Sequence, residues 1–283
     1  MVRIEHCYDG DKTELILDFN LPLDDIVFPD SLMKIDFGDA FNQKIDGIVF
    51  PYGLEKIKFG KYFDQDVSGV IFPNGLKILI FGERFNQLID YVIFPDGLKV
   101  VAFGDLFDQP LYGVTFPDSV ENITFEGCFD QSLMKVHWPN NLKNIVFGDN
   151  FNHSLFGVHF PDGLLNITFD YMFDQALYKV KLPVSLQTIT FGWHFNKSVD
   201  TFKLLKNLRV ITFGNNFNQS LDNLPPSIEK LVFSTIRKNI TNLPCSIKCI
   251  QIRGDVDMSV KRLLKIPYGC VVLDIYDEQV KIE

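Results

Sequence analysis

The sequence predicts an all-β fold, a right-handed solenoid of about 11 or 12 coils, because three sets of residues recur with a period of 22 residues. Prolines hold one position of the repeat: Pro29, Pro51, Pro73, Pro95, Pro117, Pro139, Pro161 and Pro183. Phenylalanines hold a second: Phe37, Phe59, Phe81, Phe103, Phe125, Phe147, Phe169, Phe191 and Phe213. They also hold a third: Phe41, Phe63, Phe85, Phe107, Phe129, Phe151, Phe173, Phe195 and Phe217. Three sets that share one period indicate stacked repeats.

Each repeat contains two short apolar segments separated by bends. In the first segment Ile35 and Phe37 alternate with polar residues, and in the second Ile48 and Phe50 precede Pro51. Alternation of this kind is typical of strands with one buried face, and a 22-residue repeat leaves no room for a long helix. We therefore expect two short parallel sheets, with strands about 4.8 Å apart and with the phenylalanines stacked inside.

The repeat divides the chain into three parts of one continuous domain. Residues 1–18 are expected to form an N-terminal cap, and residues 19–233 the regular solenoid. Residues 234–283 are expected to form irregular repeats and a C-terminal cap, because Pro225, Pro244 and Pro267 are spaced 19 and then 23 residues apart. Irregular end coils are typical of solenoids, which must cover an otherwise open core.

Composition narrows the classes of partner and the location. A net charge of −9 without a basic cluster argues against nucleic acid. No apolar run approaches the length of a membrane-spanning helix, so no membrane partner is expected. The start of the chain does not read as a secretory signal, and five cysteines without a CxxC pair indicate reduced thiols. These observations predict a cytoplasmic protein.

The phrase "FNQKIDGIVFP" from Phe41, followed by the pattern L-x-x-I-x-F-G, resembles the FNIP repeat. This motif of 22 residues is related to leucine-rich repeats and is found in amoebae and in the giant viruses that infect them. The resemblance covers residues 19–233 and implies a protein-interaction solenoid, in the host cytoplasm if the protein is viral. Many relatives carry an F-box, which implies a second role as a substrate-recruiting adaptor of a ubiquitin ligase. Only 18 residues precede the first repeat, so we keep this role as an alternative.

A search for catalytic, cofactor-binding or metal-binding residues gives no prediction of any such site. One column of Asn and Asp, which includes Asn42 and Asp64, supplies oxygens of the kind that calcium prefers. We interpret it instead as a turn in which the side-chain oxygen accepts backbone N–H groups. His137 and His159 are two imidazoles of one column, too few for a closed zinc site. A carbohydrate-active β-solenoid enzyme remains a further alternative, which would require a groove of clustered acids and aromatics.

Two outward surfaces are candidate sites for a protein partner. One column on the second strand changes from acidic to large apolar or amphipathic residues in the middle coils: Tyr112, Met134, Phe156 and Tyr178. The outward face of the first strand is apolar at Ile78, Ile80 and Val100. An apolar stripe with a polar rim is typical of interaction sites. The sequence thus predicts a non-enzymatic scaffold that binds another protein through an outward sheet face, with self-association through a terminal coil as a further option.

Overall fold

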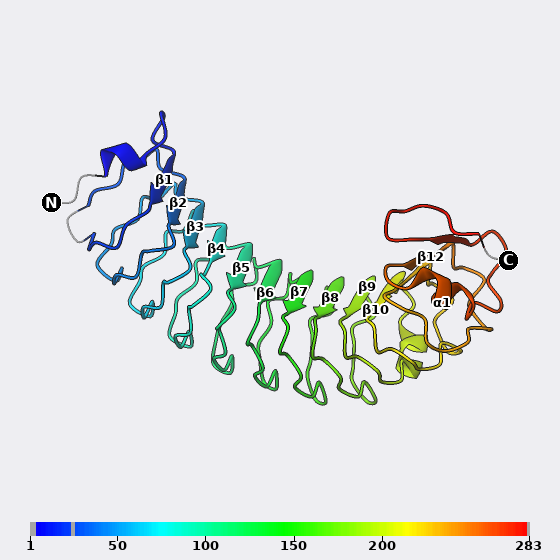
Figure 1. Ribbon diagram of the computed structural model, residues 1–283. Coiled ribbons are helices and arrows are strands. Elements are labelled where there is room, and N and C mark those ends of the chain that lie inside the picture. Colours follow the sequence, from blue (N-terminus) through cyan, green and yellow to red (C-terminus); the bar gives the residue numbers. More distant parts are fainter. Residues whose placement is uncertain (1–3, 24–25, 282–283) are drawn as a thin grey trace. The chain divides into compact units, whose positions relative to one another are not determined.

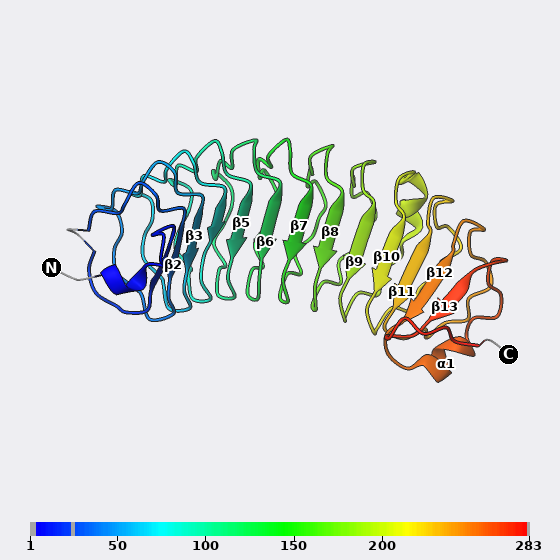
Figure 2. The same cartoon turned by 90° about the horizontal axis from the view of Figure 1, so that it is seen from above.

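The computed structural model describes residues 4–23 and 26–281, and it divides into two compact units. Unit 1 comprises Met1–Gly148 and unit 2 comprises Asp149–Glu283. In each unit the chain winds into stacked coils that place one short strand beside the next (Figure 1, Figure 2). The predicted all-β solenoid of about 12 turns of 22 residues is confirmed.

Unit 1 begins with a short 3-10 helix, η1 (Glu5–Cys7), and continues with seven parallel strands. These are β1 (Glu14–Leu17), β2 (Lys34–Phe37), β3 (Lys56–Phe59), β4 (Ile78–Ile80), β5 (Val100–Phe103), β6 (Asn122–Phe125) and β7 (Asn144–Phe147). Each strand pairs with the next one along the chain, so Ile35 faces Ile57 and Phe37 faces Phe59.

Unit 2 contains six parallel strands and two short helices. The strands are β8 (Asn166–Phe169), β9 (Thr188–Phe191), β10 (Val210–Phe213), β11 (Lys230–Phe233), β12 (Cys249–Ile252) and β13 (Val271–Leu273). The helices are the 3-10 helix η2 (Asp200–Leu204) and α1 (Val256–Val260). Strand order again follows the sequence, with a 19-residue step from Lys230 to Cys249 where the repeat becomes irregular.

The core consists of stacked phenylalanine rings, as the periodicity predicts. Ile35 and Phe37 of β2 are buried, whereas Lys34 and Asp36 point outward. Within one coil the rings of Phe103 and Phe107 lie 4.3 Å apart, and between coils Phe107 lies 6.1 Å from Phe85 and from Phe129. Because each ring is stacked on its equivalent in the next coil, one packing solution is repeated along each unit.

Within residues 4–23 and 26–281 the second parallel sheet that the sequence predicts is not formed. Ile48 and Phe50 are buried and Val49 is exposed, so the inward and outward alternation is correct. Ladder pairing is nevertheless reduced to bridges between single residues, Thr115 with His137 and His159 with Lys181 in the regular coils. The segment is only three residues long, because a turn precedes it and a proline follows it, and proline has no N–H to donate.

In several coils a glycine directly follows the phenylalanine of the first segment, and close contact between coils requires it there. A Cβ atom on Gly82 would lie 1.8 Å from the carbonyl oxygen of Gly60 in the preceding coil. By contrast, a Cβ atom on Gly47 would meet no atom within 4 Å. The close approach of the backbones at Gly82 therefore depends on the absence of a side chain at this residue.

In the described part of the chain no helix has the length and apolarity needed to cross a membrane. None of the five cysteines forms a disulfide bond: they are Cys7, Cys128, Cys245, Cys249 and Cys270.

Candidate functional site

The Asn and Asp column forms a ladder of hydrogen bonds that joins neighbouring coils. In unit 1 the Oδ1 atom of Asn86 accepts the backbone N–H of Asp108 at 2.9 Å and the Nε2–H of Gln109 at 2.9 Å. Asp64 receives the same two bonds from Asn86 and Gln87. One side-chain oxygen per coil thus ties the backbone of the next coil, which confirms the structural interpretation of this column.

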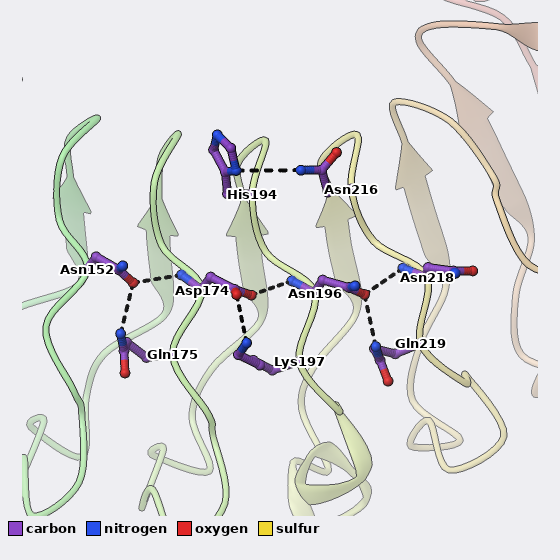
Figure 3. A network of polar contacts seen from close by, with 9 residues as sticks. All are labelled: Asn152, Asp174, Gln175, His194, Asn196, Lys197, Asn216, Asn218 and Gln219. Carbon is purple, nitrogen blue, oxygen red and sulfur yellow. Dashed lines mark hydrogen bonds and ion pairs between the residues drawn. The ribbon is translucent and has the colours of Figure 1, made fainter.

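In unit 2 the same ladder runs through Asn152, Asp174, Asn196 and Asn218 (Figure 3). Lys197 replaces the usual glutamine, and its Nζ lies 2.7 Å from Oδ2 of Asp174. The ladder therefore accepts either Asn or Asp, because only the oxygen is used as an acceptor. Among the described residues no group of three or more potential ligands is arranged to hold a metal ion.

The predicted stripe lies on turns and not on a second strand. In unit 1 Tyr112 and Met134 are 68% and 51% exposed, and in unit 2 Phe156 and Tyr178 are 62% and 71% exposed. The residue after each of them has a positive φ, +93° at Gly113 and +65° at Lys135. A positive φ at this position is typical of a type II turn, which places the preceding side chain at the outer corner of the coil.

The first-strand candidates Ile78, Ile80 and Val100 lie together on the outward face of β4 and β5. Ile78 pairs in register with Val100, and all three side chains are half-buried. They are thus less accessible than the turn residues, because neighbouring strands in the sheet shield them on both sides.

Among the described residues of unit 1, four highly exposed aliphatic side chains form a row that the sequence analysis missed. Val27, Val49, Ile71 and Ile93 are 91%, 82%, 83% and 80% exposed. They occupy one position in four consecutive coils, and in the last three coils this position lies between two buried residues of the second segment. We call these four residues the apolar row. The alternation that buries Ile48 and Phe50 already implies that Val49 points outward, so the row was readable from the sequence.

Unit 2 has aromatic and polar side chains grouped beside the ladder. Tyr171 and Trp193 stack with ring centroids 6.0 Å apart, and both are nearly half exposed. His194 lies edge-on to Tyr171 at 5.0 Å, and its Nδ1 is 3.5 Å from Nδ2 of Asn216 (Figure 3).

A shallow groove next to this group is lined by Asp174, His194, Asn196, Asn216, Asn218 and Arg237. Its one carboxylate, Asp174, is paired with Lys197. The paired carboxylates that glycoside hydrolysis requires are therefore not found in this groove.

Two thiols and one hydroxyl that could act as nucleophiles are in environments that do not activate them. Burial raises the pKa of the Cys270 thiol to about 11, so this thiol is protonated at neutral pH. Burial also raises the pKa of the Cys249 thiol. The Ser154 Oγ accepts the backbone N–H of Phe156, which gives it a structural role in a turn.

Comparison with known proteins identifies the repeat. The FNIP Repeat model matches residues 19–62, 41–84, 63–106, 85–128, 129–172, 151–194 and 195–236. A giant-virus protein is similar in structure, in a crystal structure described as "CroV588 a novel circular LRR protein structure". Its TM-score is 0.69 and its identity 31%, over 87% of this chain and 40% of that chain. This chain thus spans less than half the length of CroV588.

A second solved structure, the pneumococcal vaccine antigen PcpA, aligns with 88% of this chain and 68% of its own length. Its TM-score of 0.30 and identity of 13% are too low to support an argument. A search of the curated proteins gives no match.

Proposed function

Because the chain belongs to the FNIP repeat family, we propose that it is a non-enzymatic scaffold that binds a protein partner through outward apolar side chains. A repeat solenoid of leucine-rich-repeat type fits a protein-interaction scaffold in general. The finer proposal concerns the binding surface, and the observation that carries it is the apolar row of unit 1.

The apolar row has the chemical character of a contact surface for another protein. Four β-branched side chains in consecutive coils are each at least 80% exposed, although valine and isoleucine are among the residues most often buried. Two exposed tyrosines, Tyr52 and Tyr91, lie in the same coils, and aromatic residues are enriched at interfaces.

The row is confined to the first coils of unit 1. The equivalent position is Thr115 and then His137 in the later coils of this unit, and His159 and Lys181 in unit 2. The three apolar triplets 48–50, 70–72 and 92–94 belong to no strand, and in each the middle side chain points outward. A partner with apolar side chains would cover this surface and remove it from water, which is the main favourable term in protein association.

Tyr112 and Met134 provide a second exposed surface in the same unit, and Phe156 and Tyr178 provide one in unit 2. These four residues, together with Ile78, Ile80 and Val100, stay candidates for partner binding. The adaptor role in ubiquitin ligation stays a prediction that co-purified ligase subunits would support.

Affinity capture with matched variants tests the proposal. The tagged chain, the variant Ile71→Asp and the control His159→Asp are used to capture proteins from the native cell, with quantitative mass spectrometry as the readout. We expect Ile71→Asp to reduce at least one captured protein about tenfold or more, because a charge would be buried in an apolar contact. The control places the same charge at the same repeat position in unit 2 and is expected to retain capture.

The double variant Tyr112→Ser with Phe156→Ser distinguishes the surfaces. If this variant alone loses the partner, the turn residues bind it and the apolar row does not. If all variants capture the same proteins at the same level, the proposed binding surface is wrong.

A further inference from the structure

The Asn and Asp ladder of unit 2 ends at Asn218, and the next coil replaces its residues with cations. Asn218 donates its backbone N–H to Oδ1 of Asn196, just as Asn196 donates its own to Oδ1 of Asp174. Figure 3 shows Asn218 as the last member drawn in this row. Within the residues that the structure describes, the side-chain amide of Asn218 makes no hydrogen bond. In the aligned sequence Arg237 takes the place of the ladder residue and Lys238 that of the glutamine.

This change lies in the shortened repeat between Pro225 and Pro244, which spans 19 residues. The segment from Ile236 to Pro244 has the same length as the segment from Phe217 to Pro225, but it carries cations at the ladder position and the position after it. Its backbone is held elsewhere, because the N–H of Ile236 donates to Oγ of the buried Ser259 at 2.9 Å. Helix α1, which contains Ser259, is therefore packed against the coil that carries Arg237.

The same arrangement brings a third cation to the end of the ladder. The backbone N–H of Ile240 donates to the carbonyl oxygen of Arg262 at 2.8 Å, so the residues that follow α1 run beside the shortened coil. A recess there is lined by Asn218, Arg237, Lys238, Asn239 and Arg262. Three cationic side chains and two amides thus surround one space on the surface of unit 2.

Two of these cations are held in place by neutral acceptors. Nε of Arg237 donates to the carbonyl oxygen of Asn215 at 2.7 Å, and Nη1 of Arg262 donates to Oδ1 of Asn239 at 3.1 Å. Among the described residues none of Arg237, Lys238 and Arg262 forms an ion pair with a carboxylate. Each guanidinium carries five N–H donors, so most of its donors remain available for an oxyanion.

In another basic recess of the same unit, a carboxylate of the chain itself neutralises the cations. It is lined by Lys206, Asn207, Arg209, Glu229 and Lys248, among other residues. Glu229 is paired with both Arg209 and Lys248, and the hydrogen bond from Lys248 holds the pKa of Glu229 below its usual range. No carboxylate performs this role among the residues that line the recess of Arg237.

Two acids line the neighbouring recesses, and each has a hydrogen-bond or ion-pair partner of its own. Asp174 is paired with Lys197, and Oδ2 of Asp222 accepts the hydroxyl of Ser220 at 2.5 Å. A chain with a net charge of −9 therefore holds, in one recess, three cations without a carboxylate partner.

We propose that Arg237, Lys238 and Arg262, together with Asn218, form a binding site for an oxyanion, a phosphate group or a carboxylate. Arg clusters recognise both groups, because the planar guanidinium matches two oxygens at once. The site lies wholly within unit 2, so the proposal is independent of the apolar row in unit 1.

Titration calorimetry of the full chain with inorganic phosphate and, separately, with acetate at low ionic strength tests the site. We expect a dissociation constant of about 1 mM for the preferred anion, with weaker binding as salt is added. Tighter binding of phosphate assigns the site to phosphate groups, and tighter binding of acetate assigns it to carboxylates.

Matched variants connect this binding to the recess. Arg237→Gln and Arg262→Gln are each expected to weaken binding about tenfold, whereas Lys206→Gln removes an exposed cation from the neutralised recess and is expected to have no effect. Melting midpoints identify any variant that fails to fold, and the other arginine variant then carries the test. The proposal is overturned if neither anion binds, or if Lys206→Gln weakens binding as much as the arginine variants do.

Discussion

Replacing Asn86 by alanine removes one step of the ladder in unit 1, and its cost follows from the bonds that are lost. Asn86 accepts the N–H of Asp108 and the Nε2–H of Gln109 through one oxygen. Without it the N–H of Asp108 loses its protein partner at an exposed site, where water can take the place of the side-chain oxygen. Gln109 keeps its bond to the carbonyl oxygen of Asn86 at 3.0 Å, so the loss of its second bond adds little. We expect a destabilisation of about 1 kcal/mol, the net worth of one hydrogen bond.

Two control variants isolate the role of the oxygen. Asn86→Asp keeps the acceptor and is expected to change stability by less than about 0.5 kcal/mol, since the equivalent position is Asp64 in the coil before it and Asp108 in the coil after it. Asn218→Ala removes the last member of the ladder, whose side chain accepts no hydrogen bond among the described residues. It is expected to leave the stability almost unchanged.

Thermal unfolding gives the difference between variants, and amide hydrogen exchange locates it. The Asp108 amide is expected to exchange about fivefold to tenfold faster in Asn86→Ala, because its opening is no longer opposed by the bond. If Asn86→Ala is no more destabilising than Asn218→Ala, the ladder does not stabilise the solenoid and the reasoning fails.

Three further changes test the core, the coil spacing and the charges. Phe107→Ala, at a fully buried ring, is expected to cost about 3–5 kcal/mol in denaturant unfolding; an unchanged midpoint would remove the ring from the core. Gly82→Ala is expected to lower the melting midpoint clearly and Gly47→Ala only slightly, since only the first added Cβ meets backbone; equal shifts would contradict the close contact. Partial burial, and then the charge of Asp105, raise the pKa of Glu126. Ionisation of this carboxyl therefore lowers the stability of the fold as the pH rises through its pKa. Glu126→Gln is expected to raise the melting midpoint at pH 7. It is expected to leave the midpoint unchanged at a pH below the usual carboxyl range, where Glu126 is protonated.

Much of the fold could be predicted from the sequence, because the same pattern of residues recurs in each regular coil. The period of 22 residues located every regular strand, and the alternation of Ile35 and Phe37 identified the buried face. The role of the ladder as a structural turn was also predicted correctly. The stripe residues Tyr112 and Met134 were correctly expected to be exposed, although they lie on turns.

The second sheet could not be settled from sequence alone. Alternation shows which side chains point inward, but it does not show whether neighbouring segments pair. Pairing depends on the length of the segment between the turn and Pro51, and on how the backbones of two coils approach each other. At Val49 the alternation was right and the ladder was absent.

The sequence by itself determined the solenoid, its phenylalanine core and its ladder, because each depends on contacts that recur at one fixed separation. Only the tertiary structure brought Arg237 and Arg262 to one recess at the end of the ladder. Their approach depends on a shortened coil, on helix α1 and on the buried hydroxyl of Ser259, none of which repeats. For a residue in a regular coil, the repeat length identifies its neighbours in the adjacent coils. For a residue in an irregular coil, the neighbours are known only from the three-dimensional structure.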